Sequence, residues 1–144
     1  MAEQQRQPRE DRAAAGQARS TARQLLLADG VAVALLGALT ALLAGRLAGP
    51  LAPIPLAALQ AIGVVVAVYG VALALLARRQ WPPRRRTLLA VVGLNVVWML
   101  AVGLWLGIHG GETAAAGRWL LTATAVLAGT FAALEWMVPR QHLP

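Results

Sequence analysis

The stretch LLLADGVAVALLGALTALLAGRL, residues 25–47, decides the fold. It runs for 23 residues with one acidic side chain, Asp29, and one basic side chain, Arg46, close to its end. A helix of this length is roughly 34 Å long at 1.5 Å per residue, which is enough to cross a hydrocarbon core of ~30 Å. The stretch therefore predicts a transmembrane helix, and it raises the question of what Asp29 does inside it.

The composition of the whole chain is that of a membrane protein. Hydrophobic residues make up 58% of the 144 residues and charged residues only 13%, whereas a soluble chain averages roughly 25% charged residues. Three more apolar segments follow the first, separated by loops that contain Pro, Gly or Arg. We expect membrane spans at about residues 25–47, 56–77, 87–108 and 118–138.

Four such spans predict an all-α fold class, an integral membrane four-helix bundle with antiparallel up-down connections. The bundle would occupy residues 25–139, after a flexible or loosely helical tail rich in Arg, Gln and Ala at residues 1–24 and before a short tail at residues 140–144. The first apolar run is longer than the 7 to 15 residues usual in a signal peptide, so we expect an uncleaved membrane anchor.

The arginines predict the orientation of the bundle. All 13 basic residues are Arg, and eleven of them precede the first span, connect spans two and three, or follow the fourth. Arg46 and Arg118 fall on the other side. The positive-inside rule then places both termini in the cytoplasm of a multi-pass protein of the cell (inner) membrane. Because the arginines gather at span ends, we expect no nucleic-acid partner despite the net charge of +7.

Small residues at four-residue spacing predict close packing of the helices, because they let backbones approach. The positions are Gly37, Ala41, Gly45, Gly63, Ala67, Gly103, Gly107, Ala125, Gly129 and Ala133. Such rows on all four spans suit a compact bundle in the lipid bilayer. A row of small residues that is not used within the bundle would allow contact with a second copy of the chain or with another membrane subunit.

Five residues inside the spans form a candidate ligand or ion site. An ionisable residue within a span is a functional hypothesis by default. Counting along the spans places Asp29, Tyr69, Asn95 and Glu135 in the cytoplasmic half, with Trp98 near the middle of the membrane. Facing inward, these residues would form a cavity open to the cytoplasm, with carboxylates at its mouth and an aromatic floor that suits an apolar or cationic guest.

Each of these residues also has a structural interpretation. The dipole at the start of a helix favours a carboxylate such as Asp29, and Arg23 or Arg78 could neutralise it. Glu135 opposes the dipole at the end of its span, but Arg140 or Arg79 could pair with it. Asn95 commonly joins helices by hydrogen bonds, and the aromatic residues commonly pack.

No motif of a known enzyme class occurs, and the chain has no cysteine, so we expect no catalysis, no metal and no cofactor. The leading hypothesis is a non-enzymatic accessory or scaffolding protein that binds partner helices or lipid. The alternative is a small transporter or ligand-binding membrane protein with a cytoplasm-facing polar layer for a cationic or protonatable guest. A pocket on which Asp29, Asn95 and Glu135 converge would favour the alternative.

Overall fold

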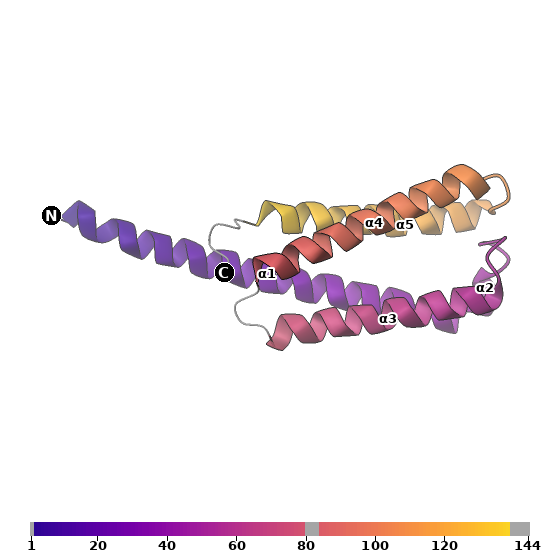
Figure 1. The fold of residues 1–144 in the computed structure, drawn as a ribbon, viewed down its shortest axis with the longest axis horizontal. Helices are drawn as coiled ribbons and strands as arrows, with labels where there is room; N and C mark the ends of the chain where they lie inside the picture. Colours follow the sequence, from indigo (N-terminus) through magenta and orange to yellow (C-terminus); the bar gives the residue numbers. More distant parts are fainter. Residues whose placement is uncertain (1, 80–83, 139–144) are drawn as a thin grey trace.

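The computed structural model describes residues 2–79 and 84–138, and every regular element within these ranges is an α-helix (Figure 1). Four of the described helices are long and apolar enough to cross a membrane, which confirms the all-α class and the candidate spans. The helices in chain order are α1 (Ala2–Leu42), α2 (Ala44–Leu47), α3 (Leu56–Arg79), α4 (Arg85–His109) and α5 (Ala115–Met137).

The largest difference from the expected boundaries is in α1. This helix begins at Ala2, so residues 2–24, expected as a flexible or loosely helical tail, continue the first span as helix. Their composition explains the extension, because Ala, Arg, Gln and Glu are among the best helix formers. At the other end the expected span is divided after Leu42, and the short helix α2 turns so that Ala44 is fully buried.

The four long helices pack as two pairs. Close contacts join α1 to α3 and α4 to α5, and a smaller set joins α1 to α5. In the view of Figure 1 the α4–α5 pair lies above the α1–α3 pair. Helices α3 and α4 make at most sparse contact with each other, so the side of the bundle between them is its loosely packed side.

Glycine and alanine bring α1 and α3 together. The same pattern, Gly-x3-Ala-x2-Gly-x3-Ala, occurs at residues 30–41 and at residues 63–74. A Cβ atom added to Gly37 would meet the backbone of Ala67, and one added to Gly30 would meet the backbone of Ala74, 2.7 Å away at its amide nitrogen. The two backbones therefore touch directly, which is the geometry that rows of small residues permit in membrane helices.

The residues expected to pack as small-residue rows have different environments. Those in the α1–α3 interface are Gly37, Ala41, Gly63 and Ala67. On α5, Gly129 lies against Met99, Ala125 is half-buried and Ala133 is exposed, because α5 turns Ala128 and Ala132 inward instead. Three glycines of the expected rows do not pack closely against the described residues, since a Cβ added to them would meet open space: Gly45, Gly103 and Gly107.

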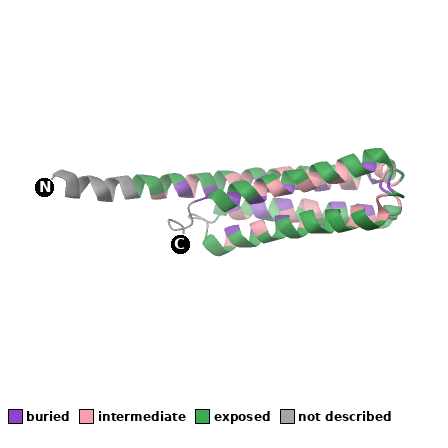
Figure 2. Cartoon of the chain, turned by 90° about the horizontal axis from the view of Figure 1, so that it is seen from above, coloured by how far each residue is buried: buried purple, intermediate pink, exposed green. Residues whose placement is uncertain are grey.

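The outward faces of the long helices are exposed in the structure (Figure 2), and many of their side chains are large and apolar. Leu42 is 80% exposed, and Val65 and Leu104 are each 67% exposed. Only 17% to 28% of the apolar window of each candidate span is buried. A surface of this kind is unfavourable in water and suits the hydrocarbon of a bilayer.

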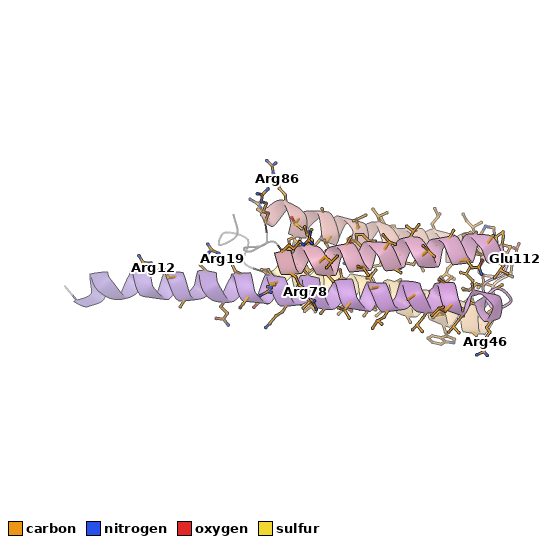
Figure 3. All side chains as sticks on the ribbon, turned by 90° about the horizontal axis from the view of Figure 1, so that it is seen from below. Arg12, Arg19, Arg46, Arg78, Arg86 and Glu112 are labelled. Atoms are coloured by element: carbon orange, nitrogen blue, oxygen red, sulfur yellow. The ribbon has the colours of Figure 1, made fainter. Side chains whose placement is uncertain are left out.

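Charged side chains gather at the two ends of the bundle. Figure 3 shows Arg78 and Arg86 at the end where α3 stops and α4 starts, here named the arginine-rich end. Arg46 and Glu112 lie at the opposite end, here named the loop end, which is formed by α2 and the connections 48–55 and 110–114. The two ends flank the long apolar segments on either side.

We expect Gly37→Ala to destabilise the fold and Gly103→Ala to leave it unchanged or more stable. The methyl group at position 37 would meet the backbone of Ala67, and overpacking of this kind costs about 1–3 kcal/mol. At position 103 the methyl group has open space, and alanine is the better helix former by about 1 kcal/mol. Thermal denaturation of both variants in one detergent measures the difference, and equal stabilities would contradict the α1–α3 interface.

Candidate functional site

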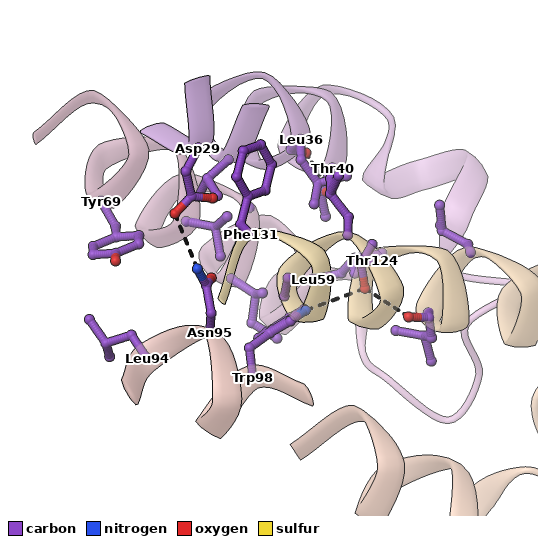
Figure 4. A pocket seen from close by; sticks show the side chains of 18 of the residues that line it. Asp29, Leu36, Thr40, Leu59, Tyr69, Leu94, Asn95, Trp98, Thr124 and Phe131 are labelled. Carbon is purple, nitrogen blue, oxygen red and sulfur yellow. Dashed lines mark hydrogen bonds between the residues drawn. The ribbon is translucent and has the colours of Figure 1, made fainter. Parts of the chain in front are cut away.

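A cavity of about 260 Å³ lies between the two helix pairs (Figure 4). This volume exceeds the roughly 150 Å³ of an engineered protein cavity that binds benzene. Its wall includes Asp29, Tyr69 and Asn95 at one end and Leu51 and Ile54 at the other. Most of the remaining lining residues are aliphatic, so the cavity is an apolar chamber with one polar end.

Two apolar clusters fill the bundle on either side of this chamber. The arginine-side cluster consists of Ala22, Leu26, Leu73, Ala77, Leu88, Val91 and Val138. The loop-side cluster consists of Ala44, Leu51 and Leu59, with Leu47, Ile54, Leu120 and Leu121 packed against them. The arginine-side cluster lies beyond the polar end of the chamber, and the loop-side cluster forms its opposite end.

The opening of the cavity toward the cytoplasm stays a prediction. The cavity extends from the polar residues toward the loop end, because the arginine-side cluster occupies the space between Asp29 and the arginines. Leu26 and Leu88 are 1% and 0% exposed there, and the small side chains of Ala22 and Ala77 allow the helices to close around them. This closure depends on tertiary packing, which residue depth along each span does not reveal.

Asp29 of α1 is fully buried at the polar end of the cavity. The Nδ2 atom of Asn95 donates a hydrogen bond of 3.2 Å to Asp29 Oδ2, which links α1 to α4 across the bundle (Figure 4). The other carboxylate oxygen, Oδ1, has no hydrogen-bond partner in the described part of the chain. One of the two oxygens of this carboxylate is therefore buried without a hydrogen bond from the described residues.

Glu135 of α5 is a second fully buried carboxylate, one helical turn from the cavity-lining residue Phe131. Neither of its oxygens has a hydrogen-bond partner among the described residues, and neither does the buried hydroxyl of Tyr69 on α3. Asp29 and Glu135 are close enough to interact electrostatically, and both interact with Tyr69. We name Asp29, Tyr69, Asn95 and Glu135 the carboxylate cluster.

The helix dipole stabilises neither of the two carboxylates. Helix α1 begins at Ala2, so the dipole at its N-terminus, which acts within the first turn, does not reach Asp29. Glu135 lies in the last turn of α5, where the dipole opposes a negative charge. Neither carboxylate has an ion-pair partner among the described side chains of residues 12–79 and 84–138. The pairing considered for Arg140 lies outside the described residues.

Arg23 instead binds the end of α3. Its Nε atom donates a hydrogen bond of 3.3 Å to the carbonyl oxygen of Ala77. A cation at the C-terminus of a helix is favoured by the dipole, so this contact explains the position of Arg23 without Asp29.

Trp98 is fixed in the wall of the cavity. Its Nε1 atom donates to Thr124 Oγ1 at 3.3 Å, and Thr124 donates to the carbonyl oxygen of Leu121 at 2.8 Å (Figure 4). The bond joins α4 to α5. Four of the five residues expected at the site therefore line the cavity, and Glu135 is buried beside it.

The lining residues Leu51 and Ile54 were not expected from the sequence. They lie in the connection 48–55, which folds back over the loop end of the chamber. An apolar residue in a proline-rich connection carries no signal of an inward orientation, so only the fold reveals their position.

The arrangement is suited to hold one positive charge. A buried carboxylate without a partner costs several kcal/mol of lost solvation, and a second one nearby adds repulsion. A proton or a bound cation removes that cost. Tyr69, Trp98 and Phe131 line the cavity close to Asp29, and aromatic faces attract organic cations.

We expect Asn95→Leu alone to lower the stability more than Asp29→Leu and Asn95→Leu together. Removing the amide leaves a buried carboxylate without its donor, at a cost of about 1–3 kcal/mol, whereas the double variant removes both polar groups. Unfolding free energies of both single variants and the double variant in one detergent measure the coupling. If the losses of unfolding free energy in the two single variants add up to the loss in the double variant, Asp29 and Asn95 do not stabilise each other, and the interpretation is wrong.

Comparisons with family models, with curated proteins and with solved structures find no significant match to this chain. The function therefore rests on the geometry of the cavity and of the carboxylate cluster.

Proposed function

We propose that this chain is a multi-pass membrane protein that binds an organic cation in the cavity, with Asp29 as its principal counter-charge and Glu135 behind it. One observation supports the proposal most directly. Asp29 Oδ1 lies at the polar end of the apolar cavity, and both oxygens of Glu135 are buried beside it. None of these three oxygens has a hydrogen-bond partner in the described structure. A positively charged guest supplies the partner that these oxygens lack.

The other residues of the site fit the same role. Asn95 holds one oxygen of Asp29 and leaves the second free for the guest. The hydroxyl of Tyr69 offers a further hydrogen bond, and Trp98 supplies an aromatic surface. We propose binding without catalysis, because each of these groups recognises charge or apolar surface.

A scaffolding role is the second candidate, and one observation favours it. Gly103 and Gly107 lie on α4 with open space where a Cβ would be. A row of small residues on an outward face allows another helix to approach closely. A partner helix or a second copy of the chain would pack there without covering the α1–α3 interface.

We further propose that the four long helices cross the cell membrane alternately, with both termini and the arginine-rich end in the cytoplasm. The eleven-to-two distribution of arginines in the sequence supports this orientation. The loop end, with Arg46 and Glu112, would then face outward.

The absence of cysteine allows a direct test of the orientation, because any introduced thiol is unique. In intact cells a membrane-impermeant maleimide should label Glu112→Cys and should not label Arg12→Cys. Both positions are exposed in the structure, so both should react after the membrane is permeabilised. Labelling of Arg12→Cys alone in intact cells would reverse the orientation.

The cation proposal predicts that octyltrimethylammonium binds to the protein in lipid nanodiscs and that Asp29→Asn weakens this binding. A contact with a charged group contributes about 1.5–3 kcal/mol, so Kd should rise about 10- to 150-fold. Glu112→Gln is the matched control, because it removes one carboxylate that is exposed at the loop end. Its Kd should stay within about twofold of the unmutated protein.

Isothermal titration calorimetry measures both values, and 1-octanol serves as the uncharged probe. Asp29→Asn should not weaken the binding of 1-octanol. An unchanged Kd for octyltrimethylammonium in Asp29→Asn would show that Asp29 is not the counter-charge.

A further inference from the structure

The cavity meets the outer surface of the bundle on the loosely packed side between α3 and α4. Helix α4 contributes only Leu94, Asn95 and Trp98 to the lining, although α3 lines the cavity from Leu59 to Tyr69. Close backbone contacts hold the pairs α1–α3, α4–α5 and α1–α5, but not α3 and α4. No comparable backbone contact therefore separates the cavity from the surroundings on this side, within the described residues.

Two lining residues on this side also belong to the exposed surface. Ile62 of α3 is 40% exposed and Leu94 of α4 is 50% exposed, while Asn95, next in the chain to Leu94, is 6% exposed. In the view of Figure 4, Tyr69 and Leu94 lie on the same side of the Asp29–Asn95 hydrogen bond. The boundary here consists of side chains that can change rotamer without moving a helix.

Packed side chains and hydrogen bonds occupy both ends of the described bundle. The arginine-side cluster contains the fully buried Leu88. At the loop end, the amide of Ala114 donates to the carbonyl oxygen of Pro50 at 3.2 Å, and Thr113 Oγ1 donates to the carbonyl oxygen of Ala52 at 3.2 Å. These bonds fasten the connection 48–55 to the start of α5, above the loop-side cluster. Opening either end would break packing or hydrogen bonds.

The shape of the cavity suits a molecule with a charged head and an apolar chain. On α1 the lining runs from Asp29 to Thr40, which is ~16 Å along the helix. The carboxylate cluster lies at one end of this length, and aliphatic residues including Val33 and Leu36 follow. A head held at Asp29 would place its chain along these residues toward Leu51.

We propose that the ligand is an amphipathic cation that enters from the hydrocarbon phase of the membrane through the side between α3 and α4, here named the lateral portal. The proposal rests on the proposed function, which supplies the need for the positive head. A ligand of this class concentrates in the bilayer, where the lateral portal would face the lipid chains.

The test measures rates as well as affinity, because blocking a portal changes the barrier but not the bound state. Octyltrimethylammonium is applied to the protein in immobilised lipid nanodiscs, and surface plasmon resonance gives both rate constants. In a variant with Ile62→Trp and Leu94→Trp, association and dissociation should both slow by about tenfold. The matched control, Val65→Trp with Leu104→Trp, changes exposed residues of the same helices outside the cavity lining and should leave both rates unchanged.

A second possible entrance is tested by Leu127→Trp. Leu127 of α5 also lines the cavity and is 40% exposed, but α1 and α5 are joined by close contacts. Slowing by Leu127→Trp instead of by the portal variant would overturn the lateral portal. Thermal denaturation of each variant establishes that it folds. If the portal variant does not fold, the smaller change Leu94→Phe replaces it.

Failure of the portal and failure of the proposed function give different results. Unchanged rates in the portal variant, together with weaker binding in Asp29→Asn, would overturn the portal and retain the cation site. Absence of binding to the unmutated protein would overturn the proposed function itself. Tetramethylammonium, which lacks the chain, should bind at least about 100-fold more weakly than octyltrimethylammonium, and equal affinity would overturn the amphipathic class.

Discussion

The direct contact between the backbones of α1 and α3 determines where the site forms. A Cβ on Gly30 would lie 2.9 Å from the carbonyl oxygen of Gly70, so these two glycines fix the register of the helices. Their chain neighbours are Asp29 and Tyr69. The contact therefore places a carboxylate and a phenol at one level of the bundle, each beside the interface that holds its helix.

The two helix pairs are tied together at separate levels and remain apart between them. The Asn95–Asp29 hydrogen bond ties them at the polar level, and the Pro50–Ala114 hydrogen bond ties them at the loop end. Between these levels the side chains of both pairs line the cavity without filling it. The carboxylate cluster thus links the two pairs. It is also the part of the described interior in which charged groups have no partners.

The spans and the depths of the polar residues could be predicted from the sequence, because both follow from counting residues along the chain. Long apolar runs located the spans, and counting residues from the span ends placed Asp29, Tyr69 and Asn95 at similar depth. Packing is different, because Gly37 and Gly103 have similar apolar surroundings in the sequence but only Gly37 meets another backbone. The direction of the cavity was likewise unpredictable, since it depends on how Leu26 and Leu88 meet from different helices. The extension of α1 to Ala2 could have been anticipated from helix propensity, which the high charge of the segment obscured.

The continuity of α1 gives the molecule a mechanical property. A single helix of 41 residues is ~62 Å long, and only part of that length lies in the apolar span. Long helices curve gently instead of kinking sharply where no break interrupts them, so the segment around Arg12 and Arg19 and the span that holds Asp29 are parts of one continuous element. A change in the tilt of the polar segment would therefore act on the span that holds Asp29.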